Sequence, residues 1–96
     1  MKITIRGFLT LKEVMGDRSE LELETGNITL MELLHELSNM FGERYTQMVF
    51  DRAGKSLNQH IRILINGRHY SHMPQKLSTR LREGDDVALF PPLAGG

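Results

Sequence analysis

Hydrophobic and polar residues alternate at the start of the chain, and this two-residue period predicts a half-buried β-strand over residues 2–9. The apolar side of that strand, which includes Leu9, is expected to face a core. Gly7 interrupts the run and indicates a bulge. A second alternating run, SELELET at 19–25, follows a turn-rich stretch. The two runs together predict a β-hairpin.

The period then changes to that of a helix in TLMELLHELSNMFG, residues 29–42. Thr29 and Glu32 have the spacing of a capping box, and Gly42 supplies a C-terminal stop. Residues on the apolar stripe of this helix are expected to fill the core, with Met40 among them as an adaptable packing group. The members of the stripe are Leu30, Leu33, Leu34, Leu37, Met40 and Phe41.

The middle of the chain gives weaker signals. Residues 43–60 predict a loop that contains one short element around 45–50. The run IRILING at 61–67 predicts a third strand that ends in an Asn-Gly turn, and a short fourth strand is expected at 68–70. This part of the chain is therefore expected to form a second hairpin.

The last predicted strand covers 86–90 and ends at Pro91, which has no N–H to offer a neighbouring strand. One four-turn helix packed across one face of a mixed four- or five-stranded sheet buries both apolar surfaces economically. The predicted class is therefore α+β, with the ubiquitin-like β-grasp arrangement and the last strand beside the first. Residues 1–90 are expected to form this single domain, and residues 91–96 a C-terminal tail.

Composition narrows the possible functions. The 96 residues carry 12 basic and 12 acidic side chains, which argues against a nucleic-acid or membrane partner. The charge is uneven along the chain, since residues 1–42 carry four Lys/Arg against seven Asp/Glu, and residues 43–96 carry eight against five. The chain has no cysteine, which excludes a disulfide, a thiolate zinc site and a cysteine nucleophile. Its N-terminal run resembles no signal sequence or membrane span, so we expect a cytoplasmic protein.

The chain ends in FPPLAGG, and two terminal glycines add nothing to a core. A narrow tail of this kind suits threading into another protein's active site, where its carboxylate can react. The pattern LREGDDVALFPPLAGG resembles the C-terminal signature of the ThiS/MoaD sulfur-carrier family, and in particular that of the small subunit of molybdopterin synthase. Leu93 stands where that family often has valine, and residues 43–60 match no family motif.

The resemblance implies a carrier chemistry in which Gly96 is the reacting residue. An E1-like adenylating enzyme of the MoeB/ThiF type would use ATP to join Gly96 to AMP, and sulfur would then replace AMP to give a C-terminal thiocarboxylate. The large subunit of molybdopterin synthase (MoaE type) would receive the tail and transfer the sulfur to a pterin precursor. The chain itself would bind no cofactor and would not be an enzyme.

Each residue of the tail has a role in this hypothesis. Proline biases the chain toward an extended conformation and lowers the entropy cost of threading, while the small residues pass a constriction. Leucine can anchor in an apolar pocket, and the six residues can reach roughly 20 Å at ~3.3 Å per residue. The predicted tail residues are Pro91, Pro92, Leu93, Ala94, Gly95 and Gly96.

Alternation also predicts which residues lie on the sheet face away from the helix. Apolar side chains with two arginines beside them, near the base of the tail, would make a docking surface for the adenylating enzyme and the catalytic subunit. The alternative is a set of ordinary scattered surface hydrophobic residues. The predicted partner-binding residues are Arg6, Phe8, Arg62, Leu64, Ala88 and Phe90.

Other functions remain open at this point. His69 and His72 raise the question of a metal site, but no third ligand is evident and we predict none. His35 is expected to face solvent. The tail chemistry is shared by a ubiquitin-like modifier that is joined to lysines, as in small archaeal modifier proteins, and by sulfur carriers for thiamin synthesis or tRNA thiolation. A β-grasp interaction module with an inert tail is the third class.

Overall fold

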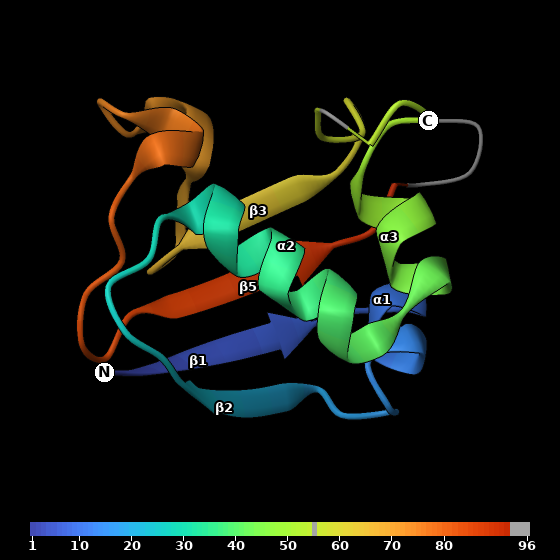
Figure 1. Ribbon diagram of the computed structural model, residues 1–96, viewed down its shortest axis with the longest axis horizontal. Coiled ribbons are helices and arrows are strands. Elements are labelled where there is room, and N and C mark those ends of the chain that lie inside the picture. Colours follow the sequence, from blue (N-terminus) through green and yellow to red (C-terminus); the bar gives the residue numbers. More distant parts are fainter. Residues whose placement is uncertain (55, 93–96) are drawn as a thin grey trace.

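The computed structural model describes residues 1–54 and 56–92, whose strands form one five-stranded sheet in the order β2-β1-β5-β3-β4. Strands β1 and β5 are parallel, and the other neighbouring pairs are antiparallel. The helix α2 crosses one face of this sheet (Figure 1). The elements in chain order are β1 (Lys2–Gly7), α1 (Thr10–Val14), β2 (Glu20–Glu24), α2 (Leu30–Phe41), α3 (Glu43–Val49), β3 (Arg62–Ile65), β4 (Arg68–His69), the 3-10 turns η1 (Tyr70–His72) and η2 (Lys76–Ser78), and β5 (Asp86–Phe90).

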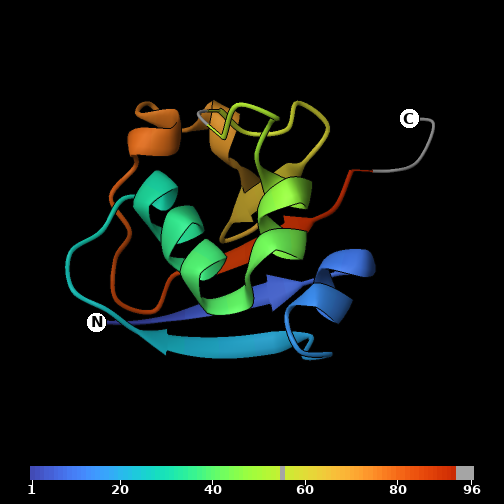
Figure 2. The same cartoon turned by 45° about the vertical axis from the view of Figure 1, so that its right-hand side comes forward.

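This arrangement confirms the predicted α+β, β-grasp architecture, including the central place of the last strand beside the first. Figure 2 shows α2 and α3 on the same side of the sheet, so one core lies between the sheet and these helices. The alternating apolar residues of the three central strands all point into it, because successive side chains of a strand face opposite sides. They are Ile3, Ile5, Ile63, Ile65, Val87 and Leu89, each at most 3% exposed.

The long helix begins where its sequence predicts. Thr29 Oγ1 accepts a hydrogen bond from the Glu32 amide at 3.2 Å, and Glu32 Oε1 accepts one from the Thr29 amide at 2.8 Å, which completes the capping box. The hydrogen bond from the Thr29 amide, and after it the Thr29 side chain, favour the ionised carboxylate and lower the pKa of Glu32. The core prediction for Met40 is wrong, since it is 46% exposed. Met40 lies at the rim of the apolar stripe, in the last turn of α2.

Two short helices were not predicted as such. Helix α1 buries Leu11 and has Met15 as its C-terminal cap, and α3 buries Tyr45 and Val49. Each helix presents a single pair of core residues four positions apart, too little for a helical period to stand out from a loop. Figure 1 shows both helices at the end of the sheet where the described chain finishes. None of the described helices is long and apolar enough to cross a bilayer.

The prediction that the Leu9 side chain faces the core is also wrong, because β1 ends at Gly7 and the chain turns away from the sheet before Leu9. Leu9 has a φ of 53° and is 64% exposed. Gly7 does not form the expected bulge, since the β1–β5 register runs without interruption to the pair Gly7–Leu89. A Cβ on Gly7 would lie 2.8 Å from Met15 Sδ and 3.4 Å from the backbone of Lys12. Glycine is therefore required for α1 to pack closely against β1.

Candidate functional site

The candidate site is the sheet face opposite α2, which we call the outer face, together with the last described residues of the chain. Side chains directly opposite each other on neighbouring strands lie on one face of a sheet. The register pairs Arg6 with Ala88, Ala88 with Leu64, and Leu64 with His69, so one row of side chains crosses β1, β5, β3 and β4. Five of the six predicted docking residues are half-buried, and Arg62 is exposed.

The chain leaves the sheet at a pair of stacked aromatic rings. Phe8, just after β1, and Phe90, at the end of β5, have ring centroids 4.3 Å apart and planes inclined by 5°. The Phe8 amide donates to the carbonyl of Leu89 at 3.2 Å, which fixes the backbone of β1 against that of β5 at this point. An aromatic pair of this kind adds ~0.5–1.5 kcal/mol beyond its area burial. Both strands are therefore held together where the last residues begin.

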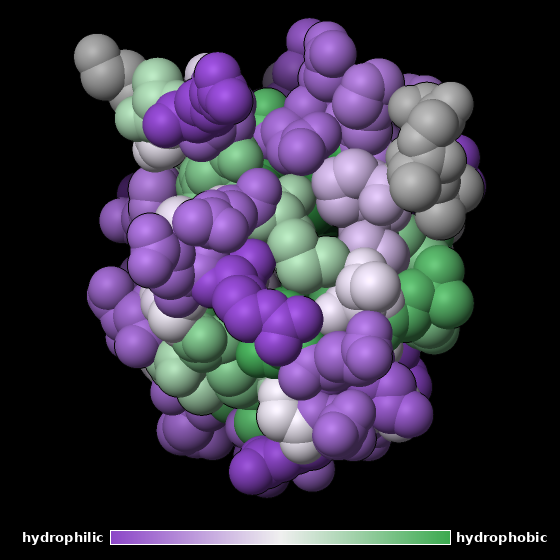
Figure 3. Space-filling view, turned by 90° about the vertical axis from the view of Figure 1, so that its right-hand side faces the viewer, coloured by the Kyte–Doolittle hydropathy of each residue, from purple (hydrophilic) through white to green (hydrophobic). Residues whose placement is uncertain are grey.

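Pro91 is buried and Pro92 is half-buried. A hollow of about 180 Å³ lies here, lined by Leu9, His60, Arg62, Phe90 and Pro91, and we call it the root hollow. Figure 3 looks at this end of the molecule and shows a strongly hydrophobic area at its right-hand edge, with further hydrophobic areas elsewhere on a mostly hydrophilic surface. The predicted tail residues Leu93, Ala94, Gly95 and Gly96 lie outside the described residues.

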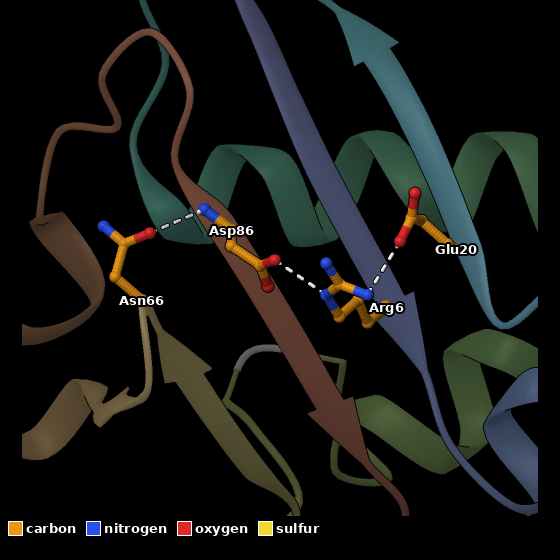
Figure 4. Close-up of polar contacts among 4 residues, drawn as sticks. All are labelled: Arg6, Glu20, Asn66 and Asp86. Atoms are coloured by element: carbon orange, nitrogen blue, oxygen red, sulfur yellow. Dashed lines mark hydrogen bonds and ion pairs between the residues drawn. The ribbon is translucent and has the colours of Figure 1, made fainter.

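Arg6 is held by carboxylates of the chain itself. Its Nε lies 2.7 Å from Asp86 Oδ2 and its Nη1 lies 2.7 Å from Glu20 Oε1, so one guanidinium bridges β1, β5 and β2 (Figure 4). The hydrogen bond and negative charge of Asp86 make the largest contribution to raising the pKa of Arg6, and Glu20 adds to it. On the other side of Asp86, its amide donates to Asn66 Oδ1 at 2.9 Å. Figure 4 shows these side chains in front of the strands and α2 behind them.

These contacts divide the predicted docking residues into two kinds. The charge of Arg6 is matched within the chain, so its interactions mainly order the outer face. Arg62 takes part in none of the ion pairs formed among the described residues, which leaves its charge available to a partner. The sequence could not separate the two arginines, because the carboxylates that pair with Arg6 come from two other strands.

Sequence reasoning also missed residues that the register brings to this face. Asn66 and Gly67 both have positive φ, at 51° and 83°, as a two-residue type I′ hairpin turn requires. That turn sets the pairing of Leu64 with His69, and alternation then places His69 on the outer face. The Asn-Gly signal was therefore sufficient to find His69, whereas nothing in the sequence places Leu9 and His60 beside Phe90.

The histidines form no metal centre with their neighbours. The rings of His69 and His72 have centroids 6.1 Å apart, and His69 Nδ1 lies 2.8 Å from Ser71 Oγ. No group of three His, Cys, Asp or Glu residues within 1–54 and 56–92 is arranged to hold a metal ion. His35 is exposed, as expected, but its ring stacks on Phe50 with centroids 4.6 Å apart.

Known proteins resemble this chain over its whole length. The ThiS family profile matches residues 5–96. The "Small archaeal modifier protein 3" of Haloferax volcanii is 31% identical over 96 residues, which cover 100% of both chains. A "Putative sulfur carrier protein" of Archaeoglobus fulgidus is 31% identical over 80 residues, covering 83% of this chain and 88% of that one.

A solved structure agrees with these sequence relatives. The crystal structure of SAMP1 from Haloferax volcanii is 28% identical, covers 100% of both chains and superimposes with a TM-score of 0.79. The same five-stranded sheet with a helix across one face is thus accompanied by detectable sequence similarity along the chain. The family model and the relatives agree with the resemblance carried by the C-terminal sequence. The chain belongs to the ThiS family, a family of ubiquitin-like β-grasp proteins.

Proposed function

We propose that this chain is a ubiquitin-like protein modifier whose C-terminal Gly96 is activated by a partner enzyme and joined to lysine side chains of other proteins. The observation that carries this proposal is the 31% identity to the "Small archaeal modifier protein 3", which extends over the whole of both chains. The likeness to SAMP1, at 28% identity over both whole chains, points the same way. The glycine pair Gly95-Gly96 supplies the residue type that such a reaction needs.

The chemistry of the proposal follows from the poor reactivity of a carboxylate. An oxygen of the Gly96 carboxylate attacks the α-phosphorus of ATP, pyrophosphate leaves, and an acyl adenylate forms in the partner's active site. The neutral amine of a target lysine then attacks the carbonyl carbon, AMP leaves with the electron pair of the broken bond, and the amine loses a proton to solvent. The ATP site belongs to the partner, an adenylating enzyme of the E1-like class, and this chain acts as its protein substrate.

The geometry of the tail's origin supports such a role. The stacked Phe8 and Phe90 and the buried Pro91 hold the end of β5 firmly, so the residues after Pro92 begin from a defined position. A fixed origin and two successive prolines reduce the number of conformations that must be given up when a tail enters a channel. The half-buried apolar residues of the outer face lie beside this origin and offer a surface to the same partner.

Sulfur carriage is the second candidate, and the "Putative sulfur carrier protein" of Archaeoglobus fulgidus favours it. The same adenylate would react with a hydrosulfide in place of lysine, releasing AMP and leaving a thiocarboxylate on Gly96. A role as the small subunit of molybdopterin synthase, with a large catalytic subunit as partner, rests on the C-terminal sequence alone. The relatives named above carry other descriptions, so we rank that role below the modifier.

Conjugation in the native host tests the proposal. Cells that produce the full chain are compared with cells that produce a variant without Gly95 and Gly96, and both are probed on a denaturing gel with an antibody to the domain. The Gly26→Ala variant is the control, because its new Cβ meets nothing within 4 Å. We expect a ladder of conjugates for the full chain and the control, and none for the truncated chain. An identical ladder for all three, or none for any, would contradict the proposal.

A further inference from the structure

A second cluster of polar residues, which shares only Arg62 with the root hollow, lies around the β3–β4 edge of the sheet. Arg62 from β3 and His69 from β4 stand on the outer face, whereas Arg68 of β4 pairs with the inward-facing Ile65 beside the hairpin turn. His72 comes from η1. With Leu64 they line an open hollow of about 610 Å³. We call the four polar residues the basic edge.

The positive charges of the basic edge are not matched by carboxylates. Every ion pair among the described residues lies on the β2–β1–β5 side of the molecule. Arg68 Nη2 donates to the carbonyl of His72 at 3.2 Å, which holds the guanidinium in place without neutralising it. Partial burial, and then the nearby His72 and Arg62, lower the pKa of His69. The arginines without carboxylate partners, and the repulsion between His69 and its cationic neighbours, describe a site that would gain from an incoming negative charge.

The opposite edge of the sheet carries carboxylates that are already paired within the chain. Glu20, Glu22 and Glu24 stand on the outer face of β2, and their ion-pair partners are Arg6, Lys2 and the Met1 amine, in that order. Half-buried Leu64 and Ala88 lie between the two edges, in one register row. A partner that covers this apolar middle therefore meets positive charges without carboxylate partners at one edge and internally paired charges at the other.

We propose that the basic edge receives an acidic segment of the protein that activates the tail. This inference rests on the proposed function, because it assigns part of the recognition of that same partner. The segment would place carboxylates against Arg62 and Arg68, with the imidazoles of His69 and His72 beside them, while the partner's apolar surface covers Leu64. Charge complementarity of this kind sets orientation and selects among partners as well as adding affinity.

Charge reversal at the basic edge tests the inference. Arg68→Glu and Arg62→Glu are compared with Arg44→Glu, which makes the same change in net charge at an exposed position of α3 on the other side of the sheet. The full chain is the substrate of the host's adenylating enzyme in ATP–pyrophosphate exchange. We expect KM for the chain to rise at least about tenfold in both basic-edge variants, with kcat unchanged. Arg44→Glu should behave as wild type, and Arg68→Lys should keep most of the affinity.

The outcomes separate this inference from the proposed function. Exchange that needs Gly96 but has the same KM for Arg68→Glu and Arg44→Glu overturns the inference and leaves the proposed function standing. If the enzyme catalyses no ATP–pyrophosphate exchange with the full chain, the proposed function fails. In that case an NMR titration of the full chain tests the inference by itself. The titrant is a peptide of alternating Asp and Leu residues with an acetylated N-terminus and an amidated C-terminus. The control peptide has Asn in place of every Asp. Shifts confined to the basic edge with the acidic peptide support the inference; equal shifts with both peptides, or tighter binding of transfer RNA than of the peptide, overturn it.

Discussion

Gly7→Ala is the substitution for which the structure gives the sharpest expectation. Gly7 is buried at the end of β1 and pairs with Leu89, and its φ needs no glycine. The added Cβ would lie 2.8 Å from Met15 Sδ, closer than such atoms approach, and 3.4 Å from Lys12 Cα. Met15 is 2% exposed, so its side chain has little room to move, and α1 must shift away from the strand instead.

The magnitude follows from overpacking. Inserting one methyl group into a well-packed region lowers the free energy of unfolding by ~1–3 kcal/mol. Replacing glycine by alanine restores ~0.4–1 kcal/mol of it, because the unfolded chain then has less conformational entropy. We therefore expect Gly7→Ala to destabilise the protein by about 1–2 kcal/mol net, or a melting temperature lower by roughly 4–16 °C for a domain of this size. The assay is urea unfolding followed by circular dichroism, with the slope m compared between variants.

Gly26→Ala is the matched control, because its Cβ meets nothing within 4 Å and its φ is not positive. It should be neutral or stabilise the protein by up to about 1 kcal/mol. Adding Met15→Ala removes the sulfur that the new Cβ would meet, so Gly7→Ala should cost less in that background than in the wild type. Equal stabilities of the Gly7→Ala and Gly26→Ala proteins would refute the close approach of α1 to β1.

Three further predictions concern the helical layer. Leu37→Ala should cost ~2–5 kcal/mol because Leu37 is fully buried, while Met40→Ala, at an exposed position, should change stability by less than about 1 kcal/mol in the same denaturation assay. Thr29→Ala should cost ~0.5–2 kcal/mol by removing the side-chain cap. It should also weaken part of the acid sensitivity due to Glu32, because the side-chain contribution is lost while the amide of residue 29 still donates to Glu32 Oε1. The pKa of Glu32 is lower in the folded than in the unfolded protein, so its contribution to the free energy of unfolding is present above the unfolded pKa and is lost as pH falls through the folded pKa. Denaturation of wild type and variant at a series of pH values between 7 and 3 measures this loss. Parallel pH profiles of the two proteins would contradict the prediction. Tyr45→Phe should cost about 1 kcal/mol, since the buried hydroxyl donates to a backbone carbonyl of α2 at 3.0 Å. Burial also raises the pKa of Tyr45, so a Tyr70→Phe variant, in which Tyr45 is the remaining tyrosine, should show no phenolate absorbance until it unfolds in alkali.

Long patterns in the sequence predicted the elements that they define. The alternation through Ile3 and Ile5, the capped helix and the strand that stops at Pro91 are all found as expected. A period is visible only when several repeats fall within one element, and α1 and α3 offer a single buried pair each. Leu9 was misplaced because a left-handed turn at a leucine leaves no mark in the sequence.

The outer face shows a second limit of sequence reasoning. Alternation selected the residues that share this face, including Phe8 and Phe90, but not the contacts between them. The ion pairs of Arg6 depend on the register of three strands, and the exposed charge of Arg62 is recognisable only once those pairs are known. Gly96 as a reacting residue came from the resemblance of the C-terminal sequence to a known family, since two glycines by themselves have no chemistry.

The most direct test of the central claim is mass spectrometry of the protein isolated from its native host under conditions that preserve thioacids and isopeptide bonds. Trypsin cleaves after Arg82 and releases the segment Glu83–Gly96 with whatever is attached to it. We expect branched peptides in which Gly96 is joined to lysines of other proteins, and a thiocarboxylate on Gly96 if the chain also carries sulfur. Gly96 found only as a free carboxylate, in cells that contain ATP and the adenylating enzyme, would contradict the account.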